Sequence, residues 1–294
     1  GGEGGGLPLG THACKAGGAA GARASGGDTI DLAQATIATG VNVKISKSLS
    51  FVGSGIGRTV LTPNASTDAS VSNDWIGVAG GATVNFTGLT VNGLSPTFGI
   101  SQAIHYLSSS GTVDTVAFLN IARPANEFDG VGVVVTAPTG TSVVTVKNSV
   151  FSNLGREGVY FQDPGTQGTV SNITYTGKGP GSFIDFGVEV AFGASVVVSN
   201  STFTNCQGVV AGASGGTSAG IQVTGPGSTL TAFGNTLQNN QVGLQVGIDQ
   251  TDSKGNVTAD TPKVTANYNN FLGNAISVLS DVSANPPVDA TPHH

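Results

Sequence analysis

Residues 145–155 read TVKNSVFSNLG, residues 169–179 read TVSNITYTGKG, and residues 197–207 read VVSNSTFTNCQ. Each stretch carries a Val near its start and an aromatic residue five positions later. The copies belong to units of about 24 to 34 residues. A unit of that length with two or three short strands cannot bury its apolar side alone, so the repetition predicts stacked units.

The same spacing extends to seven copies in the chain. The first apolar positions are Val84, Val113, Val146, Val170, Val198, Ala232 and Ala266. The positions five residues later are Leu89, Phe118, Phe151, Tyr175, Phe203, Leu237 and Phe271. A residue that tolerates a left-handed bend follows two or three positions further on, at Asn92, Asn120, Asn153, Gly177, Asn205, Asn239 and Asn274. We therefore expect a strand that ends at a bend in every copy, with the second apolar positions stacked in one interior column.

A second motif, a small residue before an alternating strand, lies between successive copies. It reads AIHY at 103, GVVV at 132, GVYF at 158, GVEV at 187, GIQV at 220, GLQV at 243 and AISV at 275. Side chains alternate between the two faces of a strand. The apolar positions are therefore predicted to point inward, and the variable ones to point outward: Val134, Tyr160, Glu189, Gln222 and Gln245. Two motifs in fixed order favour a solenoid over an immunoglobulin-like sandwich, which would not need such an order.

Composition limits the kind of protein. The chain has 294 residues, of which 46 are Gly and 10% are charged, a mix that favours strands and turns over helices. The net charge is −6 and no Lys/Arg cluster exists to neutralise a phosphate backbone, so we expect no nucleic-acid partner. No apolar run approaches the length of a membrane span, and the chain lacks Met, as a processed product would. We therefore expect a secreted, extracellular or cell-surface protein without a membrane span.

The stretch GDTIDLAQATIATGVNVKISKSLSFVGSGIGRTVL, residues 27–61, resembles the first segment of secreted right-handed parallel β-helix proteins of the pectin lyase-like superfamily. The VDAT sequence at 288–291 resembles a segment near the end of many such chains. The resemblance implies an all-β, single-stranded, right-handed parallel β-helix (a solenoid) of roughly 8–10 coils, with Asn ladders at its bends. We expect a Gly-rich N-terminal arm at 1–26, a β-helix domain at 27–282 and a C-terminal tail at 283–294. His293 and His294 in that tail have the character of a tag remnant.

Charged and aromatic side chains occur beside the second motif. Neighbouring coils lie about 4.8 Å apart, so these residues can form one acidic strip that binds a substrate. The candidate substrate-binding residues are Asp129, Arg156, Glu157, Tyr160, Asp185 and Glu189. His105 lies in the outward column of the same motif, where a surface role is more common than a catalytic one. Paired carboxylates suit glycoside hydrolysis or, with a bound cation, a lyase reaction.

The family's catalytic signatures are missing. The chain has no Asn-Thr-Asp, Asp-Asp or Gly-His-Gly motif of the galacturonase-like relatives, and Arg156 is the only basic residue of the strip. We therefore assign no catalytic residue and expect no cofactor, apart from a possible Ca²⁺. Asp249 and Asp252, in the polar turn DQTDSKGN at 249–256, are the candidate metal ligands, although an ordinary turn explains that sequence too. Cys14 and Cys206 can form a disulfide in an exported chain, or stay two buried thiols.

Three functions remain open from the sequence. The first is a secreted structural or adhesive protein, part of a matrix, surface or filament, that forms homo-oligomers or polymers through residues 1–26 and the coil ends, because solenoid ends expose unpaired strand edges. The second is a polysaccharide-active enzyme: a lyase, hydrolase or epimerase. The third is a glycan-binding module that uses the outward acidic and aromatic strip. A site that carries chemistry has to be found on the scaffold to separate them.

Overall fold

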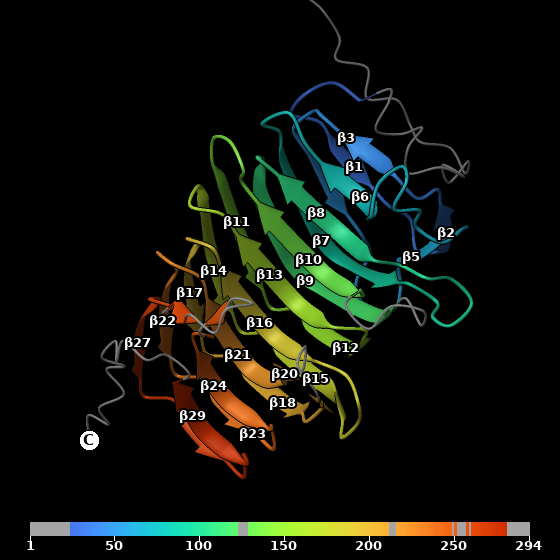
Figure 1. Cartoon of the computed structure of the whole chain (residues 1–294). Coiled ribbons are helices and arrows are strands. Elements are labelled where there is room, and N and C mark those ends of the chain that lie inside the picture. Colours follow the sequence, from blue (N-terminus) through green and yellow to red (C-terminus); the bar gives the residue numbers. More distant parts are fainter. Residues whose placement is uncertain are drawn as a thin grey trace, which may run out of the picture.

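The computed structural model describes residues 24–122, 129–211, 216–248, 250–251, 257–258 and 260–280. Every regular element in these ranges is a strand, and the strands stack into a single elongated coil from β1–β3 at one end to β27–β29 at the other (Figure 1). Among these residues there is no helix that is long and apolar enough to cross a membrane. The chain is an all-β parallel β-helix, as its repeats predict.

Three walls of parallel strands make up the coil. The first wall contains β1 (Thr29–Asp31), β4 (Leu49–Val52), β11 (Ser142–Lys147), β14 (Thr166–Ser171), β17 (Ser195–Ser199), β22 (Thr229–Phe233) and β27 (Lys263–Asn267). The second contains β2 (Thr36–Thr39), β5 (Val60–Pro63), β12 (Val150–Leu154), β15 (Thr174–Gly179), β18 (Thr202–Cys206), β23 (Thr236–Gln238) and β28 (Asn270–Leu272). The long strands β7 (Thr83–Asn92) and β9 (Ser110–Ile121) continue from the first wall into the second, which joins the two walls into one 16-stranded sheet.

The third wall is a separate nine-stranded sheet, so the described residues form nine rungs. Its strands are β3 (Val43–Ile45), β6 (Asp74–Val78), β8 (Gln102–Leu107), β10 (Val131–Thr136), β13 (Glu157–Gln162), β16 (Phe186–Ala191), β21 (Ala219–Thr224), β24 (Val242–Val246) and β29 (Ile276–Ser280). Two short antiparallel pairs lie outside the walls: β19 (Val209–Val210) with β20 (Gly216–Thr217), and β25 (Gln250–Thr251) with β26 (Val257–Thr258).

The interior is filled by columns of like residues, one from each rung. Phe151 pairs in register with Phe118 and Tyr175, Tyr175 pairs with Phe203, and the column continues through Leu237 to Phe271. The Phe118 and Phe151 rings stack with centroids 4.8 Å apart and planes 2° from parallel. The predicted interior column is therefore confirmed, although Phe271, in the last rung, is only half-buried.

One register in the repeat alignment is wrong. Val113 pairs with Phe86 and not with Val84, and Phe118 pairs with Val91 and not with Leu89. Val84 and Phe86 are both buried, and so are Leu89 and Val91. In each case the expected partner and the observed partner are two residues apart and lie on the inner side of β7. A period of two therefore fits either alignment, and the hydrogen-bond register decides between them. The other six anchors pair from Val113 through Ala266 as predicted.

A column of glycines faces the aromatic column. Its members begin the second motif in successive rungs: Gly132, Gly158, Gly187, Gly220 and Gly243. A Cβ at any of them would stand 3.0 Å or less from a ring or Leu carbon of that column or from the carbonyl oxygen of the next rung. The small residue of the motif is thus explained by close approach of the third wall to the aromatic column.

The bends behave partly as predicted. Asn120, Asn153, Asn205 and Asn239 have positive φ values between 54° and 62°, and the Asn153 amide donates to Asn120 Oδ1 over 2.7 Å. Asn92, Gly177 and Asn274 do not have positive φ, and nearby Leu94, Gly179 and Gly273 turn the chain instead. Asn and Gly therefore mark the corner correctly in every rung, but the residue that adopts the left-handed conformation shifts where the connection changes length.

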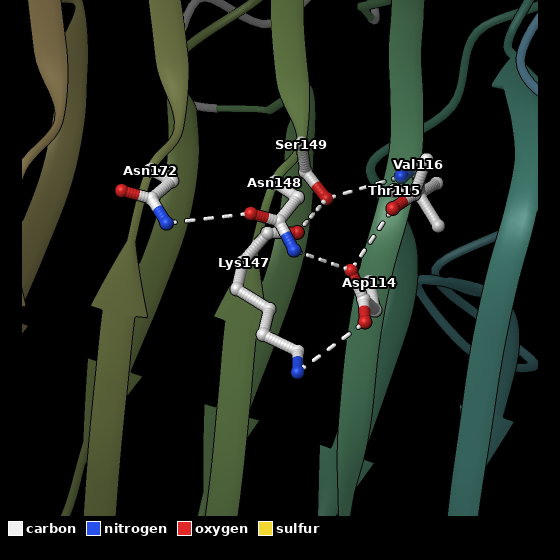
Figure 2. A network of polar contacts seen from close by, with 7 residues as sticks. All are labelled: Asp114, Thr115, Val116, Lys147, Asn148, Ser149 and Asn172. Atoms are coloured by element: carbon white, nitrogen blue, oxygen red, sulfur yellow. Dashed lines mark hydrogen bonds and ion pairs between the residues drawn. The ribbon is translucent and has the colours of Figure 1, made fainter.

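The corner between the first and second walls carries a second ladder. Asn172 Nδ2 lies 3.4 Å from Asn148 Oδ1, and Asn148 Nδ2 donates to Asp114 Oδ1 over 2.8 Å (Figure 2). Lys147 Nζ lies 3.3 Å from the other carboxylate oxygen of Asp114 (Figure 2). Asn148 and Asn172 have positive φ, as has the equivalent Asn200. The sequence interpretation missed this ladder, although an Asn stands two residues after three successive Val anchors.

Candidate functional site

The outer side of the third wall carries one column of polar side chains. Its members pair in register in successive rungs: His105, Val134, Tyr160, Glu189, Gln222 and Gln245. Their neighbours along each strand, such as Val188 and Val190 beside Glu189, belong to the hydrophobic core. The predicted inward and outward alternation is therefore confirmed on this wall.

Much of this outward column is nevertheless covered. Glu189 is 8% exposed, Gln222 is 3% exposed and Gln245 is 4% exposed. A second hydrophobic cluster, separate from the core, packs Ile184 and Val210 from the connecting segments with Phe186, Ala219, Val242 and Leu279 of the third wall. The repeat pattern does not reveal this second cluster, because Ile184 and Val210 lie in connections of irregular length.

Four of the predicted site residues form one cluster at the start of β13 and the middle of β16. Arg156 Nε lies 2.5 Å from Glu157 Oε1, and Arg156 Nη2 lies 4.0 Å from Glu189 Oε2. Tyr160 pairs directly with Glu189 across the two strands. The Arg156 guanidinium also lies over the Phe186 ring, 5.7 Å from its centroid. We call Arg156, Glu157, Tyr160 and Glu189 the Glu189 cluster.

Burial changes the proton affinities in the Glu189 cluster. The pKa of Glu189 is raised well above its ordinary value, first by burial and then by the carboxylate of Glu157, with Arg156 opposing the shift. Burial, together with Glu189 and Glu157, also raises the pKa of the Tyr160 hydroxyl. Burial lowers the pKa of Arg156, but the attraction of Glu157 and Glu189 outweighs it and the net pKa is raised. The arrangement therefore places a carboxyl that favours its protonated form beside an Arg–Glu ion pair.

The Glu189 carboxyl also has an unused acceptor. Its Oε2 atom is buried and finds no hydrogen-bond partner among the residues that the structure describes. The amide oxygen of Gln245, two rungs further along the column, is in the same state. A buried polar atom without a hydrogen-bond partner costs free energy, so these two atoms are the least well satisfied of the column.

Asp185 does not join the Glu189 cluster. Its carboxylate accepts a hydrogen bond from the hydroxyl of Tyr175 in the aromatic column and another, 2.8 Å long, from the backbone N–H of Lys178. Asp185 is fully buried, and burial raises its pKa although both hydrogen bonds oppose the shift. These contacts satisfy the one hydroxyl of the aromatic column and fix the loop before β16, so they account for Asp185 structurally.

Asp129 also has its hydrogen-bond contact outside the Glu189 cluster. Its Oδ2 atom accepts a 3.2 Å hydrogen bond from the Ser101 hydroxyl, and Ser101 is hydrogen-bonded in turn to Thr67. The acidic strip expected from the sequence is therefore shorter than predicted: the structure gathers Arg156, Glu157, Tyr160 and Glu189. Spacing along the chain could not separate the six residues, because all of them lie within a third-wall strand or just before one.

Other candidate residues have separate outcomes. Asp249 and Asp252 lie outside the residues whose side chains the structure describes, so the metal site stays a prediction. Within the described ranges, no three His, Cys, Asp or Glu side chains form a group that could hold a metal ion. Cys206 is a buried, free cysteine, while Cys14 lies outside the described residues, so a bond between them stays a prediction.

The fold and its polar outer wall define a parallel β-helix protein of the solenoid class. Residues 76–289 match the family described as the right handed beta helix region, and the chain belongs to that family. No curated protein matches the chain significantly.

Among solved structures, the chain is similar to the Azotobacter vinelandii mannuronan C-5 epimerase AlgE6 A-module, with 12% identity over 94% of this chain and 93% of that one and a TM-score of 0.41. The AlgE4 A-module of the same organism matches with 14% identity over 92% and 91% of the two chains and a TM-score of 0.28. ORF18 of Geobacillus virus E2 matches with 12% identity over 88% of this chain and 54% of that one and a TM-score of 0.31. Identities this low do not transfer a site or an activity.

Proposed function

We propose that the chain acts on a polysaccharide by proton transfer at the Glu189 cluster. The observation that supports this proposal is the raised pKa of the Glu189 carboxyl, which lies next to Glu157 and Arg156. Titratable groups with strongly shifted pKa values gather at functional sites more often than elsewhere. A buried pair of carboxyls and an Arg also contributes little to stability by itself, because removing these charges from water offsets their attraction.

Each residue of the cluster has a role in this chemistry. Protonated Glu189 donates a proton to a sugar oxygen or ring carbon, and Glu157, held by Arg156, accepts one or stabilises positive charge. Two carboxyls in different environments divide the acid and base roles in this way in sugar-processing enzymes. Tyr160 is half-buried in the same column, and its hydroxyl donates to Gln162 Oε1 over 2.7 Å. Its ring provides a surface on which a sugar can pack.

A polymer fits this wall better than a small molecule does. The column continues from Glu189 through Gln222 to Gln245, one residue in each rung, with rungs about 4.8 Å apart. Tyr160 is the half-exposed member of this stretch, so a bound polymer contacts its ring first, and it reaches the buried groups of Glu189, Gln222 and Gln245 only where the residues over the wall move aside. The reactions that remain are hydrolysis, elimination and epimerisation, and a polysaccharide substrate favours an extracellular protein.

The test combines a panel of neutral and acidic polysaccharides with three readouts. New reducing ends report hydrolysis, ultraviolet absorbance of unsaturated ends reports elimination, and proton NMR reports epimerisation. Glu189→Gln keeps the shape of the side chain and removes its transferable proton, so we expect a loss of about 100-fold or more. Asp114→Asn removes a carboxylate from the corner between the first and second walls and should retain full turnover. Unchanged turnover in Glu189→Gln, or no turnover on the whole panel, would contradict the proposal.

A second function, a structural or adhesive protein that associates with itself, has a separate observation in its favour. The outer side of the first wall carries a column of uncharged residues in register: Thr145, Thr169, Val197, Thr231 and Thr265. Val143 and Phe233 on the same wall are 50% and 41% exposed. An open, uncharged β-surface of this kind suits contact with a second copy of the chain. The arm at 1–26, expected from the sequence to take part, lies largely outside the described residues.

Light scattering over a range of concentrations tests self-association. If the first wall is the contact, Thr169→Lys with Thr231→Lys should keep the chain monomeric, because the added positive charges repel the same charges on a second copy. If the arm is the contact, deletion of residues 1–26 should do so instead. A wild-type chain that stays monomeric at high concentration would exclude both routes.

A further inference from the structure

A separate group of side chains lies on the outer side of the third wall, three rungs before Glu189. Asp74 begins β6, His105 lies within β8, and Thr136 ends β10, so three successive strands each provide one residue. His105 Nδ1 lies 3.0 Å from Asp74 Oδ1, and His105 Nε2 lies 2.8 Å from Thr136 Oγ1. The imidazole thus connects a carboxylate to a hydroxyl through its two opposite nitrogens.

The surroundings fix this arrangement. His105 pairs with Gly77 on one side and with Val134 on the other. A Cβ on Gly77 would lie 3.0 Å from Asp74 Oδ2, so the glycine leaves the space into which the Asp74 carboxylate folds beside the ring. Val134 is 2% exposed and closes the opposite side. The ring is therefore packed on both sides, while the three polar residues keep partial contact with solvent.

The charge state of Asp74 agrees with these contacts. Burial raises the pKa of Asp74, but the hydrogen bond and the charge of His105 outweigh it, together with Ser72 and Lys44, and the net pKa is lowered. Asp74 is therefore a carboxylate near neutral pH, which favours the His105 tautomer with its proton on Nδ1. In that tautomer Nδ1–H donates to Asp74, and Nε2 accepts a hydrogen bond from the Thr136 hydroxyl.

We propose that Asp74, His105 and Thr136 form a catalytic site that hydrolyses small O-acyl esters, with Thr136 as the nucleophile. Carboxylate, imidazole and hydroxyl in this order are the arrangement that activates a hydroxyl in acyl transfer, and it is recognised by geometry and not by chain position. The inference stands on these three side chains and does not rest on the function proposed for the Glu189 cluster.

The reaction balances with water as the only co-reactant. Thr136 Oγ bonds to the ester carbonyl carbon as its proton passes to His105 Nε2, and the carbonyl π electrons move to the oxygen. When this intermediate collapses, the bond to the alkoxy oxygen breaks and the leaving alcohol takes the proton from His105, which leaves an acyl-Thr136 ester. Water then attacks the acyl carbon as His105 accepts its proton, and Thr136 leaves with that proton while the free acid departs. Asp74 touches no reacting atom, so it is a positioning residue that holds His105 and stabilises its positive charge.

Ester hydrolysis by the whole chain is measured with p-nitrophenyl acetate. Thr136→Val and His105→Asn should each lower the turnover rate by about 100-fold or more, because the first removes the hydroxyl and the second removes the imidazole that takes its proton. Thr136→Ser keeps a hydroxyl and should retain most of the rate. Asp74→Asn should lower kcat and leave KM nearly unchanged, which a merely structural role would not produce.

The matched control is Thr224→Val. Thr224 occupies the strand position of Thr136 three rungs further along, in register through Gln162 and Ala191. Its pairing neighbours include no histidine, so the wild-type rate is expected. Circular dichroism of each variant confirms that the β-helix is intact.

A covalent readout completes the test. Diethyl p-nitrophenyl phosphate should phosphorylate Thr136 in the wild-type chain, as mass spectrometry of peptides reports, and should not label it in His105→Asn. Wild-type rates in folded Thr136→Val, no hydrolysis above buffer, or a label elsewhere in the chain would overturn the proposal. Loss of both hydrolysis and labelling in Thr136→Val, with activity retained in Thr136→Ser, would support it.

Discussion

The outer sides of the first and third walls follow the same rule and end in different environments. On the first wall, Thr169 and Thr231 are open to solvent, and Val197 between them is 37% exposed. On the third wall, Glu189 and Gln222 occupy an equivalent outward column but are 8% and 3% exposed. Both columns alternate with core residues and run in register from rung to rung.

The difference comes from what lies over each wall. Ile184 and Val210 in the connections around β16 and β19 pack on the third wall, whereas the first wall keeps its row of Thr and Val exposed. The period-two alternation along a strand therefore sets whether a side chain points inward or outward. The connecting segments that pack on the wall set how exposed an outward side chain is to solvent. A carboxyl on the exposed first wall would keep an ordinary pKa, whereas burial on the third wall raises the pKa of Glu189.

The largest loss of stability is expected in the aromatic column, which fills the interior between the first and third walls. Phe203→Ala removes a fully buried ring between Tyr175 and Leu237 and should lower the free energy of unfolding by about 3–5 kcal/mol. Phe233→Ala is the matched control, because Phe233 is 41% exposed on the first wall and should cost little. Urea unfolding measures both, and equal losses would mean that the inner and outer positions are misassigned.

A smaller effect is expected at the contact between the third wall and that column. A Cβ on Gly187 would lie 2.2 Å from Phe203 Cδ1 and 2.6 Å from the carbonyl oxygen of Gly220. Gly187→Ala should therefore lower the free energy of unfolding by about 1–3 kcal/mol. Gly40→Ala, where a Cβ meets no atom within 4 Å, is the control and should be nearly neutral. A neutral Gly187→Ala would show that the two columns do not pack this closely.

The pH dependence of stability separates the two walls by its sign. The folded-state pKa of Glu189 is raised by burial and by Glu157, so the folded chain binds this proton more tightly than the unfolded chain. Its contribution to stability is complete below the ordinary Glu pKa of about 4.3 and is lost as pH rises through the raised value. Relative to Glu189→Gln, the wild-type chain should therefore lose stability from acid toward alkaline pH. Urea unfolding of both chains across this range should show it, and a constant difference would mean that folding does not shift the pKa of Glu189.

The smallest effect, with the opposite sign, is expected at the corner between the first and second walls. Burial raises the pKa of Asp114, but hydrogen bonds from Asn148, Thr115 and Lys147 outweigh it and lower the net pKa. This stabilisation is present above the ordinary Asp pKa of about 3.9 and is lost as pH falls. Because the pair is partly exposed, Asp114→Asn should cost only about 0.2–1 kcal/mol at neutral pH and less in acid. A cost that grows on acidification would contradict this assignment.

The sequence predicted where on the third wall the candidate site lies, but it did not predict which of the candidate residues contact one another. Tyr160 and Glu189 could be placed in one column because they occupy the same step of successive copies. Asp185 could not be separated from them, because its partner Tyr175 belongs to another wall. The contacts of Asp74 and Thr136 with His105 were missed for a similar reason: Asp74 lies before the seven aligned copies, and Thr136 stands at the end of its strand with no mark in the repeat.

The sequence by itself determined that the chain is a β-solenoid, where its corners fall and which residues form its interior column. These follow from short-range periods, because alternation and a repeated spacing act on every rung alike. Only the tertiary structure decided that β7 pairs two residues out of the expected register, that the Glu189 carboxyl is covered, and that His105 connects Asp74 to Thr136. Those facts depend on hydrogen-bond register and on irregular connections between rungs, which bring together residues about 30 positions apart with no local signal in the chain.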